Sequence, residues 1–162
     1  MPGAECNGLG HGGNVNSVRG AVSLETVVTL AHQEDAVAQC VLGTYYEFGR
    51  GVPRDLHAAI KYYQLSANQG LAEAQYTLGL KYARGIGVYQ NFGESLQWLI
   101  KAANQQHIPA MVTLSEASLT GRYASAGYNL DVVRGRNLLN QARVLCKEGY
   151  NIRRDTLDWV ET

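Results

Sequence analysis

The feature that most constrains the fold of this chain is an internal repeat of 36 residues. Residues 36–71 align without a gap on residues 72–107, and about a third of the aligned positions are identical. In the first copy the identical positions are Ala36, Ala38, Gln39, Leu42, Gly43, Tyr46, Gly49, Gly51, Val52, Ala67, Asn68 and Gln69. A period in this range is typical of arrays in which each repeat buries its apolar face against its neighbours.

Each repeat is predicted to form two helices joined by a short loop. In the first helix, Ala38, Leu42 and Tyr46 recur at a helical interval and share one face. The second helix carries a stripe at i, i+3, i+4 and i+7. Its members are Ala59, Tyr62, Tyr63, Ser66 and Ala67 in one copy and Ser95, Trp98, Leu99, Ala102 and Ala103 in the other. We therefore expect an all-α fold of stacked hairpins, with Tyr46, Tyr62, Tyr63 and Tyr82 in the core.

Glycines mark two further features of the repeats. Gly43 and Gly79 lie in the middle of first helices, where glycine costs about 1 kcal/mol relative to alanine. We expect a close helix crossing there, and the third copy still has a small residue, Ser115. Paired glycines in residues 49–52 and 85–88 permit the positive φ that ends a helix. The loops are followed by the N-cap residue types Asp55, Asn91 and Asp131.

The repeats are predicted to lie within one domain, residues 21–162, preceded by a flexible tail rich in glycine and asparagine, residues 1–20. The predicted order within the domain is a capping helix (21–35), repeat 1 (36–71), repeat 2 (72–107), a degenerate repeat 3 with an insertion (108–149) and a C-terminal cap (150–162). The insertion, around residues 122–129, is interpreted either as a second contact surface or as a solvated bulge.

Composition and charge argue against several classes of function. The 162 residues are enough for one ordinary domain. The 14 basic and 14 acidic residues balance, so we expect no nucleic-acid ligand. The sequence contains no run of about 18 apolar residues, so we expect no membrane span. Cys6, Cys40 and Cys146 show neither a disulfide framework nor a metal-binding pattern, and Cys40 is expected to be a small buried side chain. Without a disulfide framework the cysteines are expected to stay reduced, which favours a cytoplasmic location. A periplasmic or secreted location is the alternative if an export signal was removed.

No constellation of residues indicates catalysis. His11, His32, His57 and His107 are scattered, without the spacing of a metal site on one helix face, and are interpreted as solvated or helix-end residues. The carboxylates are expected to lie singly on helix surfaces, without the partner that acid–base work requires; they include Glu47, Glu73, Glu94 and Glu116. We expect no enzyme activity, no cofactor and no metal, and a small-ligand binder or enzyme is the least favoured alternative.

Positions of the first helices outside the core stripe are candidates for partner binding, since they are expected to face a groove. They are Val41, Thr44, Tyr45, Phe48, Thr77, Leu80, Lys81, Arg84, Thr113 and Glu116. The apolar end at Val41, Tyr45 and Phe48, next to the basic Lys81 and Arg84, suits a peptide or helix. The alternative is that the three apolar residues pack beneath the N-terminal helix.

The first copy contains, in order, Ala36, Ala38, Gln39, Leu42, Gly43, Tyr46, Gly49, Gly51, Val52, Asp55, Ala59, Tyr62 and Tyr63. This pattern resembles the Sel-one-like repeat, a relative of the tetratricopeptide repeats. The second copy keeps the aromatic position as Trp98 and departs at Asn91 and Leu99. The resemblance implies a right-handed α/α superhelix whose concave face is built mainly from first helices.

The resemblance also implies a function: an adaptor, often bacterial, that holds a partner protein or peptide without catalysis. A narrower alternative is an immunity or effector-binding protein of a bacterial secretion-system cluster. The paired cysteines of the disulfide-linked subclass are absent, so the resemblance does not extend to that subclass. The end faces of a short array also allow self-association into a homo-oligomer.

Overall fold

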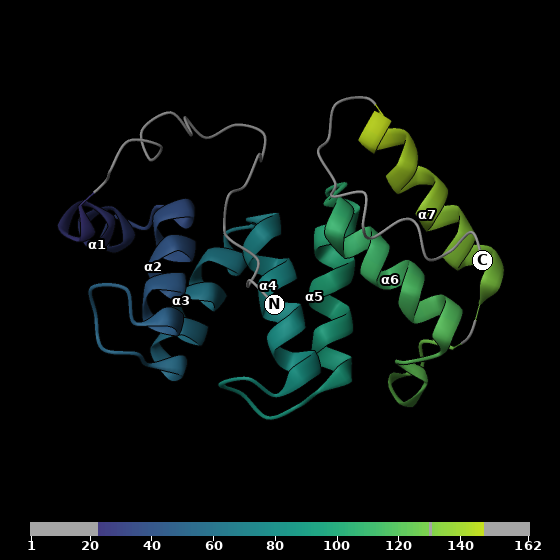
Figure 1. The fold of residues 1–162 in the computed structure, drawn as a ribbon, viewed down its shortest axis with the longest axis horizontal. Coiled ribbons are helices and arrows are strands. Elements are labelled where there is room, and N and C mark those ends of the chain that lie inside the picture. Colours follow the sequence, from purple (N-terminus) through teal and green to yellow (C-terminus); the bar gives the residue numbers. More distant parts are fainter. Residues whose placement is uncertain (1–22, 130, 148–162) are drawn as a thin grey trace.

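The computed structural model describes residues 23–129 and 131–147, and every regular element in these ranges is a helix. The elements are α1 (Leu24–His32), α2 (Ala36–Phe48), α3 (Leu56–Asn68), α4 (Ala72–Arg84), α5 (Phe92–Asn104), α6 (Ile108–Thr120), the short 3-10 helix η2 (Ala124–Ala126) and α7 (Val132–Lys147). Figure 1 shows the α-helices in order along the longest axis of the molecule. The predicted all-α solenoid is therefore confirmed. The predicted tail, residues 1–20, and the predicted C-terminal cap, residues 150–162, lie outside the described residues.

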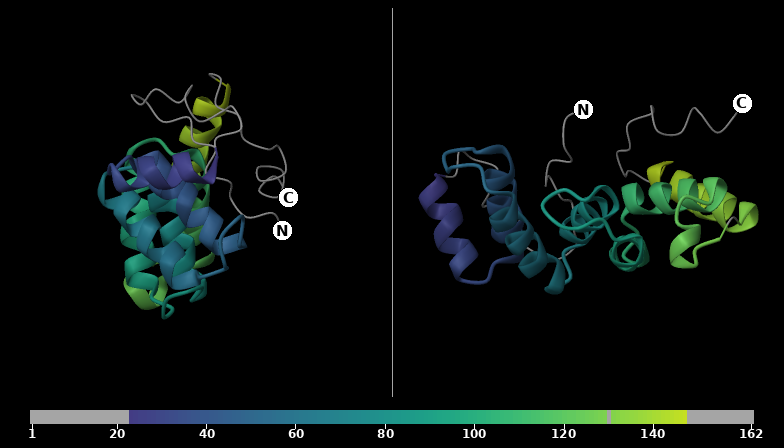
Figure 2. Two further views of the ribbon diagram at one scale, coloured as in Figure 1. Left: turned by 90° about the vertical axis from the view of Figure 1, so that its left-hand side faces the viewer. Right: turned by 90° about the horizontal axis from the view of Figure 1, so that it is seen from below.

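The helices pair into hairpins that stack on one another. Contacts are most extensive within α2–α3, α4–α5 and α6–α7, and each hairpin also packs on the next (Figure 2). One buried cluster joins the first hairpin to α4, and its members are Cys40, Ala59, Ile60, Tyr63, Ala67, Ala74 and Leu78. The first hairpin thus completes its core against the second, as expected for a repeat array.

The helix ends form where their capping residues predict. Gly49, Gly85 and Gly121 end the three first helices with φ of 67°, 67° and 66°. The carboxylate of Asp55 accepts hydrogen bonds from the backbone N–H groups of the first turn of α3. The predicted N-caps are confirmed at this position and at Asn91 and Asp131.

The predicted close helix crossings are confirmed at both mid-helix glycines. A Cβ added to Gly43 would lie 2.8 Å from ring atoms of Tyr63 on α3. A Cβ added to Gly79 would lie 2.9 Å from Cγ of Leu99 and 3.2 Å from the carbonyl oxygen of Ser95, both on α5. Since these distances are shorter than van der Waals contact, a side chain at either glycine would push the paired helices apart.

The insertion in the third repeat contributes to the core, so its interpretation as a solvated bulge was wrong. Tyr123 and Tyr128 are 2% and 6% exposed and belong to a cluster with Leu99 and Leu114. The ring of Tyr123 meets that of Phe92 edge-on at 5.4 Å. The insertion therefore brings two aromatic side chains into the buried core.

Cys40 differs from its expectation in one respect. Its side chain is fully buried, as expected, but it is disulfide-bonded, whereas Cys146 is a free cysteine. The expectation of unpaired thiols was therefore wrong at Cys40. The cytoplasmic location stays a prediction, and the expected reduced state of the cysteines no longer supports it.

Candidate functional site

A small surface depression lies between the end of α2 and one face of α4. Its volume is about 50 Å³. The residues that line it are Glu47, Phe48, Thr77, Leu80, Lys81, Arg84 and Ile86. Five of these seven are among the candidate partner-binding residues, and four of them follow the i, i+3, i+4, i+7 spacing along α4 that puts side chains on one helix face.

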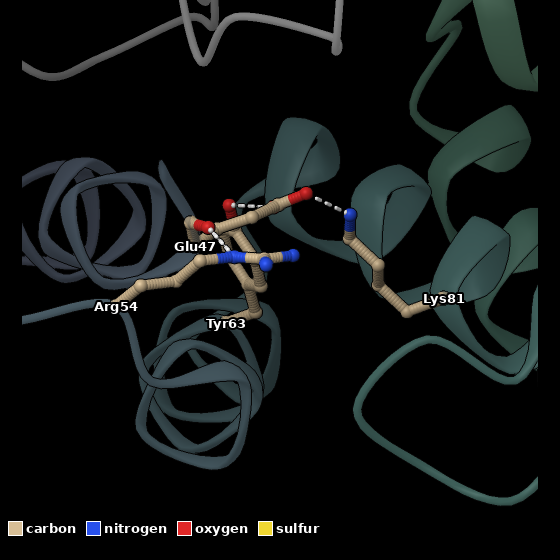
Figure 3. Close-up of polar contacts among 4 residues, drawn as sticks. All are labelled: Glu47, Arg54, Tyr63 and Lys81. Atoms are coloured by element: carbon tan, nitrogen blue, oxygen red, sulfur yellow. Dashed lines mark hydrogen bonds and ion pairs between the residues drawn. The ribbon is translucent and has the colours of Figure 1, made fainter. Parts of the chain in front are cut away.

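A polar network centred on Glu47 forms one wall of the depression. The hydroxyl of Tyr63 donates a 2.8 Å hydrogen bond to Oε2 of Glu47, and Nζ of Lys81 pairs with Oε1 (Figure 3). Nε of Arg54 donates to the backbone carbonyl of Glu47 at 3.0 Å. The side chains of Glu47 and Lys81 are each only 14% exposed. The network links α2, α3 and α4, and the expectation of a solitary surface carboxylate was wrong for Glu47.

Burial and the neighbouring carboxylate keep Tyr63 protonated. Desolvation raises the pKa of Tyr63 well above its ordinary value of 10.0, and the charge and hydrogen bond of Glu47 raise it further. Tyr63 is therefore a fixed hydrogen-bond donor at neutral pH. Because Tyr63 and Lys81 occupy both carboxylate oxygens, Glu47 serves to join helices.

Two polar groups of the depression are left without partners in the described part of the chain. Thr77 is 5% exposed, and its Oγ1 is buried without a hydrogen bond. Arg84 is exposed and forms no ion pair with any described residue. A buried hydroxyl without a partner is costly in the free protein, and the depression thus holds one unsatisfied hydroxyl and one arginine without an ion pair among the described residues.

The candidate residues on α2 were expected either to face a partner-binding groove or to pack beneath the N-terminal helix, and each interpretation holds for some of them. Val41 and Tyr45 pack, partly buried, against the cluster that contains Val27 of α1, so they contribute to the core of the capping helix. Thr44 is also buried, and its hydroxyl donates to the carbonyl of Val41 at 2.6 Å. Phe48 is 46% exposed and lies at the rim of the depression.

The candidates on α6 do not line the depression. The hydroxyl of Thr113 donates to the backbone carbonyl of Pro109 at 2.8 Å. Glu116 pairs at 3.1 Å with Arg122, the first residue of the insertion. Because these groups are satisfied locally, the structure offers no unpartnered polar group at Thr113 or Glu116.

Two residues of the depression, Glu47 and Ile86, were not predicted from the sequence. A comparison of the two repeats could have pointed to Glu47. It aligns with Ala83 of repeat 2, and Tyr63, which donates a hydrogen bond to it, aligns with Leu99. Repeat 2 thus builds the same hairpin with apolar residues. The polar network is a departure from the repeat pattern, and such departures can be sought by comparing the copies.

His107 has the helix-end role expected for it. Its Nδ1 accepts a hydrogen bond from the backbone N–H of Ala110 at the start of α6, and its Nε2 lies 2.8 Å from Glu73. Glu73 is therefore paired, contrary to the expectation of a solitary carboxylate. Within residues 23–129 and 131–147, no cluster of three metal-ligating side chains occurs. In the same ranges, no helix combines the length and apolarity that crossing a bilayer requires.

Stacked helical hairpins with glycine-ended first helices define a helical repeat solenoid of the tetratricopeptide-like kind. Residues 36–71 and 72–107 each match the family model of the Sel1 repeat. Residues 36–107 are thus two Sel1 repeats, and the resemblance seen in the sequence is confirmed for this part of the chain. Sel1 repeat proteins bind protein partners, are generally protein-interaction scaffolds and are typically non-catalytic.

Two solved structures are similar to this chain. A Sel1 repeat protein from Oxalobacter formigenes is 29% identical with a TM-score of 0.68, and the match covers 74% of this chain and 46% of that one. The protein c5321, a protective antigen present in uropathogenic Escherichia coli strains and displaying an SLR fold, is 31% identical with a TM-score of 0.69. That match covers 78% of this chain and 26% of c5321, so the chain spans less than half the length of either protein. No curated protein matches the chain.

Proposed function

We propose that this chain is a non-catalytic scaffold that binds a partner protein or peptide on the concave face formed by α2, α4 and α6. The observation that supports this function is the depression between α2 and α4. There Phe48 of repeat 1 meets Thr77, Leu80 and Arg84 of repeat 2 around a buried hydroxyl without a partner. Exposed aromatic and arginine side chains are the usual anchors of protein interfaces.

The size of the depression supports a macromolecular partner. Its volume of about 50 Å³ is well below the roughly 300–1,000 Å³ typical of small-molecule sites. It can accept one side chain of a partner that lies across the first helices. Affinity would then come from a wider surface around this anchor point.

The test is affinity capture from the source organism with matched surface variants. Leu80→Glu places a charge in the depression, whereas the control Leu65→Glu makes the same change at a side chain of α3 that is 41% exposed. Circular dichroism first establishes that both variants are folded. We expect the wild type and Leu65→Glu to retain the same partner and Leu80→Glu to lose it. Capture of the same proteins by all three would contradict binding at this face.

The narrower alternative, an immunity or effector-binding protein of a secretion-system cluster, is decided by the identity of that partner. A captured secreted toxin whose activity the chain inhibits would support it. Self-association through an end face also stays a prediction. The outer side of α7 exposes Val132 and Val133 by 43% and 70%, so light scattering of the wild type and Val133→Glu tests this contact.

A further inference from the structure

We propose that the depression between α2 and α4 is a subsite for the carboxylate side chain of a partner's aspartate or glutamate flanked by an apolar residue. This inference rests on the proposed function, since it specifies the partner segment that the scaffold binds. It is carried by the charge balance of the site, its unsatisfied hydroxyl and its size.

The charge balance favours an anionic group. Lys81 neutralises Glu47, whose second carboxylate oxygen already accepts from Tyr63. Arg84 has no such counter-charge in the described ranges, so the lining residues carry one positive charge in excess. Arg50, whose guanidinium lies 5.3 Å from the ring centre of Phe48, adds a second positive charge at the rim. An arginine without a partner can bind a carboxylate through two parallel hydrogen bonds.

The unsatisfied hydroxyl supplies a second donor. Thr77 precedes Arg84 by two helical turns on the same face of α4, and its Oγ1 lacks a hydrogen-bond partner. Side chains on a helix lean toward its N-terminus, so an arginine at position 84 can reach back toward Thr77. A carboxylate paired with Arg84 would accept from Oγ1 as well once the Thr77 side chain turns its buried hydroxyl toward the depression, and this would remove the cost of the unsatisfied hydroxyl.

The size and walls of the depression limit the ligand further. A volume of about 50 Å³ holds about three to five water-sized groups, which suits the carboxyl end of an aspartate or glutamate and excludes an aromatic ring. Phe48, Leu80 and Ile86 form apolar walls beside the charged groups. Phe48, which lies at the rim, would contact a neighbouring apolar side chain of the partner that stays outside the depression.

The first test is a selection of random linear peptides displayed on phage. The C-terminus of each peptide is fused to the coat protein, so only side-chain carboxylates are presented. We expect the wild type to enrich peptides in which an aspartate or glutamate neighbours an aliphatic or aromatic residue. Arg84→Glu should lose this preference and favour lysine or arginine at that position. Lys61→Glu, an equal charge change at an exposed residue of α3, should keep the wild-type preference.

The second test measures affinity by fluorescence anisotropy. We expect an enriched peptide to bind the wild type about tenfold or more tightly than its amide counterpart, in which asparagine or glutamine replaces the acidic residue. Thr77→Val should weaken binding of the acidic peptide about fivefold while the protein stays folded. The amide counterpart should be affected less, because it bears no charge on the group that faces Thr77.

Three outcomes would overturn the inference. They are enrichment without an acidic preference, the same acidic preference in Arg84→Glu and Lys61→Glu, and no enrichment over uncoated beads. The capture experiment separates these failures from a failure of the scaffold function. If Leu80→Glu still abolishes capture of a partner, the face binds proteins and only the carboxylate chemistry is wrong.

Discussion

The hydroxyl of Ser115 donates a 2.7 Å hydrogen bond to the backbone carbonyl of Gly135 where α6 crosses α7. A Cβ added to Gly135 would lie 2.9 Å from Cγ of Leu119 and 3.1 Å from the carbonyl oxygen of Ser115. In the preceding hairpin the residue types are exchanged, because Gly79 on the first helix faces Ser95 on the second. Each of these two crossings thus pairs one glycine with one serine, since there is no room for a second side chain.

We expect Gly135→Ala to lower the free energy of unfolding by about 1 kcal/mol, because overpacking exceeds the gain in helix propensity. Urea unfolding measures the change. Exchanging the pair, Ser115→Gly with Gly135→Ser, should not recover the wild-type stability, because Cγ of Leu119 would still lie 2.9 Å from the new Cβ. Gly93→Ala is the control, since a Cβ there meets only the carboxamide oxygen of Asn91 at 3.3 Å. Equal losses in Gly135→Ala and Gly93→Ala would contradict the steric explanation.

We expect Thr77→Val to raise the free energy of unfolding by about 1 kcal/mol, because it removes a buried hydroxyl that has no hydrogen-bond partner. Thermal and urea unfolding would detect the increase. The matched control is Thr44→Val, which removes a buried hydroxyl that donates to Val41 and should give no increase. If Thr77→Val destabilises the protein, Oγ1 has a partner in solution. A rise in stability together with weaker peptide binding would identify Thr77 as a residue retained for binding.

We expect Tyr63→Phe to lower the free energy of unfolding by about 2 kcal/mol, because a partly buried carboxylate loses a charge-assisted hydrogen bond. Tyr62→Phe should change it little, since Tyr62 contributes mainly by stacking on Tyr46 at 5.6 Å. A double-mutant cycle with Glu47→Gln measures the coupling between Tyr63 and Glu47. A coupling energy near zero would show that the hydrogen bond does not stabilise the fold.

The raised pKa of Tyr63 predicts a loss of stability at alkaline pH. Above the ordinary value of 10.0, Tyr63 ionises in the unfolded chain but stays protonated in the folded one, so the unfolded state binds fewer protons. The free energy of unfolding should then fall by about 1.4 kcal/mol per pH unit from this group. Urea unfolding of the wild type and Tyr63→Phe between pH 8 and about 11 tests this. The slope above pH 10 should be shallower in the variant, and identical slopes would contradict the assignment.

The sequence by itself determined the helices, their ends and the repeat. Gly49 and Gly85 adopt the left-handed conformation that the paired glycines predicted, and Asp55 caps the next helix as expected. Such features depend on one residue and its chain neighbours. The buried stripe was predictable for a similar reason, since residues at helical spacing share a face whatever packs against it.

Only the tertiary structure decided which groups meet across the repeats. Thr44 and Thr77 were both predicted to face the groove. The hydroxyl of Thr44 donates to a backbone carbonyl, whereas that of Thr77 is buried without a hydrogen-bond partner beside the depression. Glu47 looked like a solitary surface carboxylate, but it joins Tyr63 and Lys81, which lie 16 and 34 residues further along the chain. Contacts of this kind depend on the rotation and offset between stacked helices. Those are set by the packing of all their side chains together, so no single stretch of the sequence encodes them.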